Sequence, residues 1–205
     1  MHHKFVIASN NAHKVGEFKR ILSDLSVDVI SAKEAGIDFS DVEETGTTFA
    51  ENAKIKAMYA FEKCGLPCIA DDSGLCVDAL DGRPGIYSAR YGGENSTDDE
   101  KINLLLKELD GVSKDNRNAH FNCSICCVIS NDDIITAEGK CEGYIGFDKR
   151  GLNGFGYDPV FYLQNGKAFA ELDASEKDSC SHRGNALRIF YNLLKERKDL
   201  FNVNQ

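Results

Sequence analysis

The chain opens with an apolar run over residues 4–8, which stops at a polar loop, Ser9-Asn10-Asn11-Ala12-His13-Lys14. Apolar residues then recur three and four positions apart, which predicts one buried face of an α-helix, at Val15, Phe18, Ile21, Leu22 and Leu25. A polar loop that leads into a helix presents free N–H groups and the positive end of the helix dipole, so it suits an anion. A plain Asn or Ser cap explains the loop equally well. Lys14 favours the anion site. A lysine in the first turn is unfavourable next to the positive end of the helix dipole, and a phosphate bound nearby would compensate for it.

The same patterns predict alternating strands and helices in the next part of the chain. We expect a strand over 27–30, a helix over 48–63, a strand over 68–70 and a strand over 75–80. Gly65 and Pro67 mark the end of the helix, because glycine and proline commonly follow a helix C-terminus. The strand over 68–70 is expected to break into a turn at Asp71-Asp72-Ser73-Gly74, since these residue types are frequent turn formers.

The second half of the chain is richer in strands. We expect a capped helix over 97–109, an antiparallel hairpin of 118–129 and 134–145, a strand over 160–163 and a helix over 185–197. Strand-helix units followed by a hairpin indicate an α/β fold. The predicted architecture is a mixed central sheet flanked by helices, with a β-rich second lobe and a cleft between the lobes, in a single domain over residues 1–205.

Composition and charge exclude several classes of protein. Of the 205 residues, 42% are hydrophobic and 28% are charged, so a packed core is expected. No apolar run approaches the roughly 20 residues of a membrane span, and Ser9 interrupts the start before a signal peptide could form, so we expect a cytosolic protein without a membrane partner. The formal net charge of −9 argues against a nucleic-acid polymer as a partner. A small anion can still bind where a few lysines and a metal ion gather in one cleft.

The eight cysteines could indicate a zinc site or disulfides, above all in the run Cys123-Ser124-Ile125-Cys126-Cys127. This run resembles a strand, in which side chains alternate between faces, so Cys123 and Cys126 are expected to point in opposite directions. Two ligands on opposite faces do not chelate one ion. We therefore expect reduced, buried thiols.

The adjacent carboxylates of Asp71 and Asp72 are the strongest chemical feature of the first half. Two like charges this close repel each other. A hard cation, a proton on one of them, or full solvation relieves the repulsion. A solvated acidic turn is the simplest alternative for these residues taken alone.

A glycine-rich passage, Gly154-Phe155-Gly156-Tyr157-Asp158-Pro159, is the strongest feature of the second half. It could be an ordinary tight loop. A phenylalanine between two glycines could instead stack flat on a base, a contact worth roughly 1–3 kcal/mol. The pair His182-Arg183 precedes the last predicted helix and could simply be surface residues.

Seven motifs, taken together and in order, resemble the inosine-triphosphate pyrophosphatase family over nearly the whole chain. They are Ser9-x-Asn11-x-x-Lys14, Glu43-Glu44-Thr45-Gly46, Glu51-Asn52-Ala53 with Lys56, Ala70-Asp71-Asp72-Ser73-Gly74, Pro84-Gly85-Ile86-Tyr87-Ser88-Ala89-Arg90, Gly154-Phe155-Gly156-Tyr157-Asp158-Pro159 and Ser181-His182-Arg183-Gly184. The resemblance implies hydrolysis of ITP, dITP and XTP to the monophosphate and pyrophosphate. It also implies a homodimer.

The resemblance further implies a role for each matching residue. The residues expected to contact the triphosphate are Ser9, Asn10, Asn11, Ala12, His13, Lys14 and Lys56, and Ser73 is expected to contact substrate. Glu44 and Asp72 match the positions that bind Mg²⁺, and Asp72 also matches the proton acceptor. The residues expected around the purine base are Phe155, Gly156, Tyr157, Asp158, Lys177, His182 and Arg183. Asp71 is left as a supporting or capping residue.

Two departures and two alternatives accompany this interpretation. Ser9 stands where the family often has Thr, and His13 stands where it often has Gly. The alternative functions are a nucleotide-binding sensor without catalysis and a pyrophosphatase for other modified nucleotides. How GTP would be excluded does not follow from the residues, because guanine shares the 6-oxygen of hypoxanthine.

Overall fold

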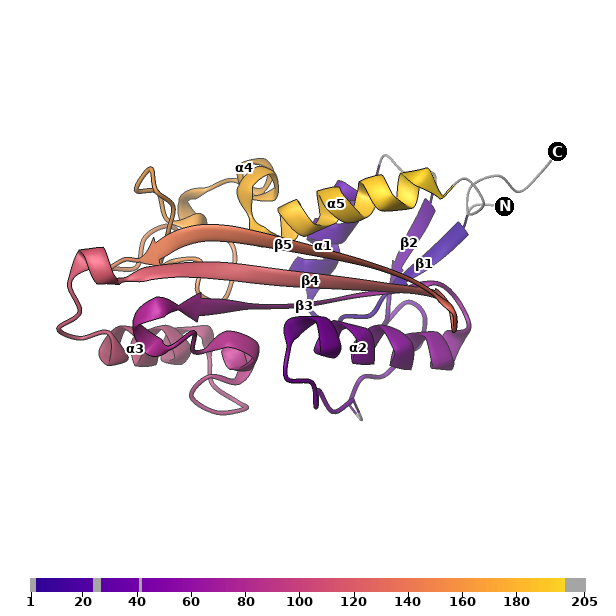
Figure 1. Cartoon of the computed structure of the whole chain (residues 1–205), viewed down its shortest axis with the longest axis horizontal. Coiled ribbons are helices and arrows are strands. Elements are labelled where there is room, and N and C mark those ends of the chain that lie inside the picture. Colours follow the sequence, from indigo (N-terminus) through magenta and orange to yellow (C-terminus); the bar gives the residue numbers. More distant parts are fainter. Residues whose placement is uncertain (1–2, 24–26, 41, 198–205) are drawn as a thin grey trace. The chain divides into compact units, whose positions relative to one another are not determined.

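The central element is a six-stranded sheet with the strand order β2-β1-β3-β4-β5-β6, seen in the computed structural model in Figure 1. The structure describes residues 3–23, 27–40 and 42–197, so Leu25 of the first predicted helix lies outside the described residues. The strands are β1 (His3–Ile7), β2 (Val27–Ser31), β3 (Cys68–Val77), β4 (Asn118–Ser130), β5 (Asp133–Ile145) and β6 (Phe161–Tyr162). β1 pairs in parallel with β2 and β3, whereas β5 pairs antiparallel with β6. The sheet is therefore mixed, which confirms the predicted α/β class.

The helices and the hairpin follow the predicted pattern closely. The α-helices are α1 (Ala12–Ile21), α2 (Phe49–Cys64), α3 (Asp98–Glu108), α4 (Ala174–Cys180) and α5 (His182–Glu196). α2 and α3 each begin with a capping box, in which a threonine and a glutamate three residues later satisfy free N–H groups at the helix start. Gly65 ends α2 in the left-handed conformation that a glycine adopts without strain.

The chain divides into two compact units. The first, unit 1, takes its described residues from Met1–Asp72, Cys123–Gly139 and Gly184–Gln205, and unit 2 is formed by Ser73–Asn122 and Lys140–Arg183. The chain passes from one unit to the other within β3, β4 and β5, so the boundary at Asp72 and Ser73 falls inside a strand.

Unit 1 has a separate hydrophobic core on each face of its strands, because successive side chains of a strand point to opposite faces. One core joins alternate strand residues to α1 and α5, through Phe5, Ile7, Phe18, Leu22, Phe190 and Leu194. The other joins the intervening strand residues to α2, through Val6, Ala8, Ala53, Ala57 and Ala60. Figure 1 shows α1 and α5 on one side of these strands and α2 on the other. The small alanines let α2 lie close to the strands that carry the site described below.

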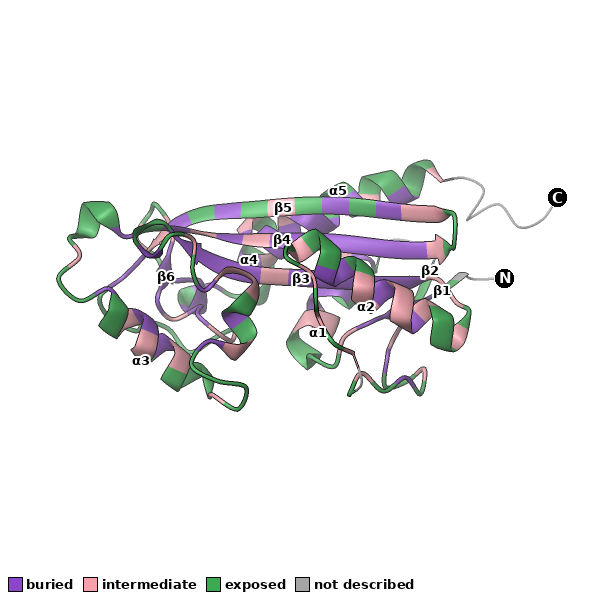
Figure 2. Ribbon diagram, turned by 60° about the horizontal axis from the view of Figure 1, so that its bottom comes forward, coloured by how far each residue is buried: buried purple, intermediate pink, exposed green. Residues whose placement is uncertain are grey.

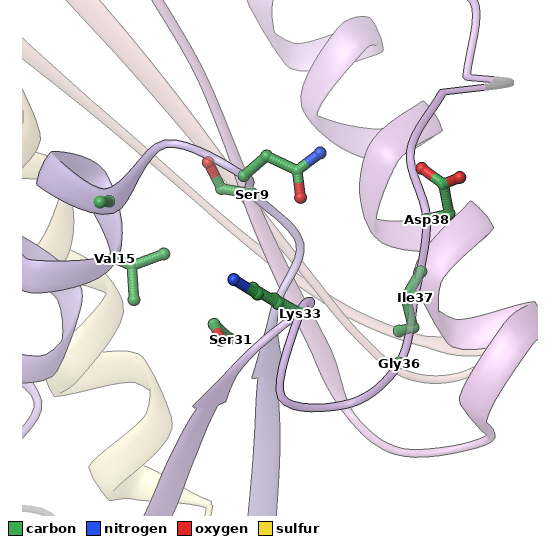
Figure 3. A pocket seen from close by; sticks show the side chains of 9 residues that line it. Ser9, Val15, Ser31, Lys33, Gly36, Ile37 and Asp38 are labelled. Carbon is green, nitrogen blue, oxygen red and sulfur yellow. The ribbon is translucent and has the colours of Figure 1, made fainter.

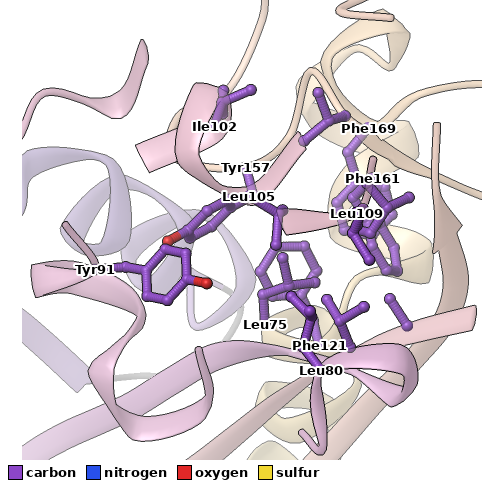
Figure 4. Packing of buried hydrophobic residues seen from close by; sticks show 14 of the residues in the cluster. Leu75, Leu80, Tyr91, Ile102, Leu105, Leu109, Phe121, Tyr157, Phe161 and Phe169 are labelled. Carbon is purple, nitrogen blue, oxygen red and sulfur yellow. The ribbon is translucent and has the colours of Figure 1, made fainter. Parts of the chain in front are cut away.

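Unit 2 packs α3 and several loops around an aromatic core (Figure 4). The ring of Phe121 lies 4.7 Å from that of Phe161 and 5.9 Å from that of Phe169, between ring centroids. Tyr157 belongs to the same core. Burying each large side chain contributes roughly 1.5–3 kcal/mol relative to leaving it exposed, so this cluster gives unit 2 a stable core of its own.

The predicted turn at Asp71-Asp72 is wrong. Both residues lie inside β3, which runs without interruption from Cys68 to Val77 and is buried along nearly its whole length (Figure 2). Each carboxylate has a lysine partner from elsewhere in unit 1, so neither needs a solvated turn. The separate strand predicted over 75–80 is also wrong at its ends, because β3 reaches Val77 and a 3-10 helix, Asp78–Leu80, follows.

The smaller differences lie in the last quarter of the chain. The strand predicted over 160–163 is reduced to the two residues of β6. α4 was not predicted, and α5 begins three residues before the predicted helix. No helix of the described residues is long and apolar enough to cross a membrane.

The cysteines behave as a strand pattern predicts. Cys123 lies in the core beneath α1 and α5, whereas Cys126 lies in the core beneath α2. All eight cysteines lie among the described residues, none of them forms a disulfide, and six are buried. Cys123 and Cys126 therefore point to opposite faces, as expected.

Candidate active site

The polar loop after β1 connects directly to α1. Asn11 is the N-cap, and its side-chain oxygen accepts hydrogen bonds from the backbone N–H groups of His13 and Lys14. Ser9 supports the loop by accepting a bond from the Asn11 N–H at 3.2 Å. Ala12, His13 and Lys14 thus form the first turn of α1. Lys14 lies in the first turn as predicted, whereas the predicted polar loop is shorter and ends at Asn11. β1 lies between β2 and β3, and ligands commonly bind at the carboxyl ends of strands where the strand order reverses in this way.

One side of this loop borders a pocket of about 590 Å³ within unit 1 (Figure 3). Ser9 and Asn10 line it from the loop, and Ser31, Lys33 and Asp38 line it from the end of β2 and the segment that follows. A volume of this size is typical of small-ligand pockets, which usually measure about 300–1,000 Å³. The predicted phosphate loop therefore borders space that a ligand can enter.

Lys14 connects the loop to the acidic pair on β3. Its ammonium lies 3.0 Å from Oδ2 of Asp71. The Asp71 side chain is completely buried, and the Cys123 thiol donates a long hydrogen bond to the same oxygen at 3.9 Å. Asp71 therefore holds Lys14 beside the first half of β3.

Lys56 on α2 connects the two predicted metal-binding carboxylates. Its ammonium lies 2.8 Å from Oδ1 of Asp72 and 3.4 Å from Oε1 of Glu44. Both Lys56 and Asp72 are largely buried, with 12% and 10% of their side-chain surfaces exposed. The structure thus brings together three residues that lie in separate motifs of the sequence.

Burial and charge shift the pKa values of this pair. Burial raises the pKa of Asp72, and the positive charges of Lys56 and Lys14 only partly oppose that effect. For Lys56, burial alone would lower the pKa, but the carboxylates of Asp72, Glu44 and Asp71 outweigh burial and raise it. Lys56 therefore stays charged, and Asp72 takes up a proton more readily than an exposed aspartate does.

The carboxylates of Glu44 and Asp72 suit a divalent metal that is shared with a ligand. Both carboxylates contact the Lys56 ammonium, and a nearby positive charge stabilises the ionised form of the buried Asp72 carboxylate. Among the described residues, no group of three or more His, Cys, Asp or Glu side chains could hold a metal by itself. This donor set fits Mg²⁺, which is usually bound by one or two carboxylates together with phosphate oxygens and waters.

Asn52 belongs to this cluster, although its sequence motif gave it no role. Its amide nitrogen donates to Oδ2 of Asp72 at 3.4 Å, and its amide oxygen accepts from the Gly46 N–H at 2.8 Å. Gly46 leaves room for this contact, because a Cβ there would lie 2.6 Å from the Asn52 oxygen. The spacing of four residues between Asn52 and Lys56 is the signal that could have revealed it, since such residues share one helix face.

In unit 2, Asp158 organises the glycine-rich loop. Its Oδ2 accepts a hydrogen bond from the Phe155 N–H at 2.9 Å and pairs with the Lys177 ammonium at 2.5 Å. The Lys177 ammonium also lies 4.7 Å from the centre of the Phe155 ring. Phe155 itself is partly exposed, whereas Asp158 and Lys177 are buried. The arrangement presents an aromatic ring whose position is set by a buried ion pair.

Three other predicted base-binding residues are buried and anchored in unit 2. Arg183 is almost inaccessible and donates from Nη2 to the Ser73 hydroxyl at 2.7 Å. The His182 ring stacks on that of Phe121, with 4.6 Å between ring centroids. The Tyr157 hydroxyl donates to the Ser88 carbonyl at 3.0 Å, and burial raises its pKa. Tyr157 therefore has its ring in the core rather than in open space.

The predicted site residues fall into two sets. Unit 1 holds those assigned to the triphosphate and the metal, from Ser9 to Lys14 with Glu44, Lys56 and Asp72, and unit 2 holds Ser73 and those assigned to the base. Within unit 1, the structure brings Lys14 to Asp71 and Lys56 to Asp72 and Glu44. Within unit 2, it brings Lys177 to Asp158 and Phe155.

Known proteins resemble this chain over nearly its whole length. The model of the Ham1 family matches residues 5–193, a range that includes every predicted site residue. A dITP/XTP pyrophosphatase of Geobacillus kaustophilus is 50% identical over 185 residues, 90% of each chain. A dITP/XTP pyrophosphatase of Haemophilus influenzae is 47% identical over 195 residues, which cover 92% of this chain and 97% of the relative.

Solved structures agree with the sequence comparison. A HAM1 protein from Coxiella burnetii has a TM-score of 0.86 and 42% identity, covering 95% of this chain and 99% of its own. The Ham1 protein of Staphylococcus aureus has a TM-score of 0.84 and 44% identity, covering 94% of this chain and 98% of its own.

Proposed function

Because the chain belongs to the Ham1 family, we propose that it hydrolyses purine nucleoside triphosphates with unusual bases, namely ITP, dITP and XTP, to the monophosphate and pyrophosphate. The relatives described above carry the name dITP/XTP pyrophosphatase. The observation that carries the proposal is the contact of one buried ammonium, that of Lys56, with the carboxylates of both Glu44 and Asp72. Such a cluster supplies the base, the metal ligands and the positive charge that phosphoryl transfer needs.

The residues of unit 1 act on the triphosphate in this proposal. The positive end of the α1 helix dipole, next to the loop from Ser9 to Lys14, favours phosphate oxygens. Lys14 and Lys56 add two positive charges that neutralise the leaving pyrophosphate. Each lysine already pairs with a carboxylate, so each is fixed in place before substrate arrives.

Asp72 is the proposed general base. It removes a proton from a water molecule that attacks the α-phosphorus, the bond from that phosphorus to the bridging oxygen breaks, and pyrophosphate leaves with the electron pair. The raised pKa of Asp72 suits this role, because a stronger base accepts a proton more readily. General-base help is worth about 10²–10⁴ in rate, and positioning and charge neutralisation supply the remainder.

Magnesium is the proposed cofactor, with Glu44 and Asp72 as the residues that would hold it. When bound, Mg²⁺ offsets the negative charge of the phosphates. Asn52 holds the Asp72 carboxylate through one of its oxygens.

The residues of unit 2 select the base. Phe155 stacks on the purine, Asp158 and Lys177 hold Phe155 and line the base site, and His182 and Arg183 donate hydrogen bonds toward the 6-oxygen. A donor aimed at a 6-keto oxygen faces another donor when adenine presents its 6-amino group. Unpaired buried polar groups of this kind can reject the wrong substrate by about 10⁴–10⁵.

The test is a steady-state assay with Mg²⁺ on ITP, XTP, dUTP, GTP and ATP that measures pyrophosphate and free phosphate separately. We expect pyrophosphate from ITP and XTP and little product from ATP. Comparable rates on ITP, XTP and ATP would contradict the proposed base selection. Tight ITP binding without turnover would favour the sensor alternative, and turnover of dUTP alone would favour a pyrophosphatase for other nucleotides. A homodimer, a single domain of two lobes and a cytosolic location stay predictions.

A further inference from the structure

Phe155, the proposed base-stacking residue, lies between two glycines, so local backbone preferences do not fix its conformation. Gly154 and Gly156 on either side have φ angles of +78° and +60°. Glycine visits this region freely, and it also visits many others. The direction of the Phe155 ring therefore depends on contacts that fix the loop from outside.

One contact fixes the loop on its N-terminal side. Oδ2 of Asp158 accepts the Phe155 N–H and pairs with Lys177, both within unit 2. These residues already belong to the proposed base site. The Phe155 carbonyl also accepts the Asp158 N–H at 3.3 Å, which closes a turn over residues 155–158. Neither bond engages the Gly156 N–H, so that group needs a second contact, with a residue outside the turn.

Asp98, the first residue of α3, provides that second contact. Its Oδ2 accepts the Gly156 N–H at 2.7 Å. Its Oδ1 lies 2.7 Å from the ammonium of Lys101, which also donates to the Ala89 carbonyl at 3.4 Å. The Thr97 capping box fixes the start of α3. The carboxylate is thus held at three points, by its helix, by Lys101 and by Gly156.

We propose that Asp98 is a positioning residue for base recognition, which acts through the Gly156 N–H to hold Phe155 ready to stack. The inference rests on the proposed function, and it concerns how that same site achieves its affinity for the base. A loop that is ordered before binding costs less to bind than one that orders during binding. Without Asp98, the Gly156 N–H loses its acceptor, and substrate must supply the part of the ordering that this bond provides.

The neighbouring residue Asp99 is a matched control. It lies in the same first turn of α3, carries the same charge and pairs with a lysine, Lys149, at 3.0 Å. Its side chain is 79% exposed. Loss of either aspartate removes the same charge from the same turn, so the two variants differ mainly in the bond to Gly156.

The first measurement is hydrogen–deuterium exchange over residues 154–158 in the wild type, D98A and D99A. We expect faster exchange in D98A alone. Equal exchange in D98A and the wild type would overturn the inference, whatever the activity. If D98A does not fold, D98N serves instead. Its amide oxygen can still accept the Gly156 N–H but lacks the charge, so we expect exchange between that of the wild type and that of a loop without the bond.

The second measurement is steady-state kinetics with ITP. We expect D98A to raise KM about tenfold, as for the loss of a hydrogen bond to a charged acceptor, with kcat within about twofold, as for lost uniform binding. D99A should match the wild type and D98N should recover part of the loss. In an F155A background, D98A should add little, because both changes remove the same interaction. An equally large effect of D98A in that background would overturn the inference. A wild type that releases no pyrophosphate from ITP would instead refute the proposed function, while the exchange measurement would still decide whether Asp98 orders the loop.

Discussion

The ammonium nitrogen of Lys56 lies 2.8 Å from a carboxylate oxygen of Asp72, in a largely buried ion pair. Glu44 approaches the same nitrogen from a separate loop. A buried pair is strongly coupled, because removal of one partner leaves the other charged in a poorly solvated place. The catalytic properties of Asp72 therefore depend on Lys56, and substitutions of the two residues should have distinct signatures.

Asp72→Asn should remove most turnover and keep nucleotide binding nearly intact. The amide has the shape of the carboxylate but cannot accept the proton of water, so we expect kcat to fall by about 10²–10⁴. Single-turnover kinetics and calorimetric titration with ITP measure the two properties separately. Asp110→Asn, which changes an exposed aspartate, serves as the control and should leave both unchanged. A kcat near that of the wild type in Asp72→Asn would rule out the base.

The pH dependence of kcat/KM should report the buried carboxylate. Burial raises the pKa of Asp72, and a base acts only when ionised, so activity should be lost as pH falls through that raised pKa. The acid limb should therefore lie above the ordinary aspartate pKa of about 3.9. In Lys56→Met the limb should move to still higher pH, because Lys56 is the main group that lowers the Asp72 pKa.

The matched control for this experiment is Lys56→Arg, which keeps the positive charge and should keep the limb near its wild-type position. Only the position of the limb is diagnostic, since Lys56→Met also loses a phosphate contact and should be slower at every pH. A limb that moves to lower pH in Lys56→Met would be incompatible with the proposed coupling.

The local signals in the sequence located the elements well, because they act over a few residues. The capping pair of Thr97 with Glu100 predicted where α3 begins, and the helix expected from Thr48 is α2, which also begins with a capping box. The polar loop before Lys14 is likewise followed by a helix. Each of these signals depends on hydrogen bonds between near neighbours, which composition and spacing reveal.

The error at Asp71-Asp72 has a long-range cause. Two adjacent acids are poor strand residues by themselves, and the lysines that compensate them lie 57 and 16 positions away in the sequence. No local rule could supply those partners. The contact between Ser73 and Arg183 spans 110 positions, and only the family resemblance had pointed to both residues.

Gly154→Ala should disturb base recognition as well as stability. A Cβ at Gly154 would lie 2.0 Å from Oδ2 of Asp158, the oxygen that binds Phe155 and Lys177. The Asp158 side chain must therefore move, and we expect a higher KM for ITP together with a lower melting temperature.

Gly166→Ala is the control that separates steric conflict from backbone strain. Gly166 has a similar φ of +81°, but a Cβ there would have nothing within 4 Å. Both variants should lose roughly 1–2 kcal/mol of unfolding free energy through the left-handed conformation, and only Gly154→Ala should change KM. A similar rise of KM in both would show that the contact with Asp158 is unimportant.

Lys177→Met should be strongly destabilising, because it leaves the Asp158 carboxylate buried without its cation. The side chains of Lys177 and Asp158 are only 8% and 4% exposed, and removing one partner of a buried pair typically costs about 3–5 kcal/mol.

Lys149→Met is the control. It breaks the exposed pair with Asp99 and should cost less than about 1 kcal/mol. Urea unfolding of the two variants beside the wild type measures the difference in unfolding free energy. The two methionine variants lose the same charge and gain the same side chain, so the gap between them reports the burial of the pair. Equal losses would mean that water reaches Asp158 once Lys177 is removed, and the buried pair would then have no special part in holding Phe155.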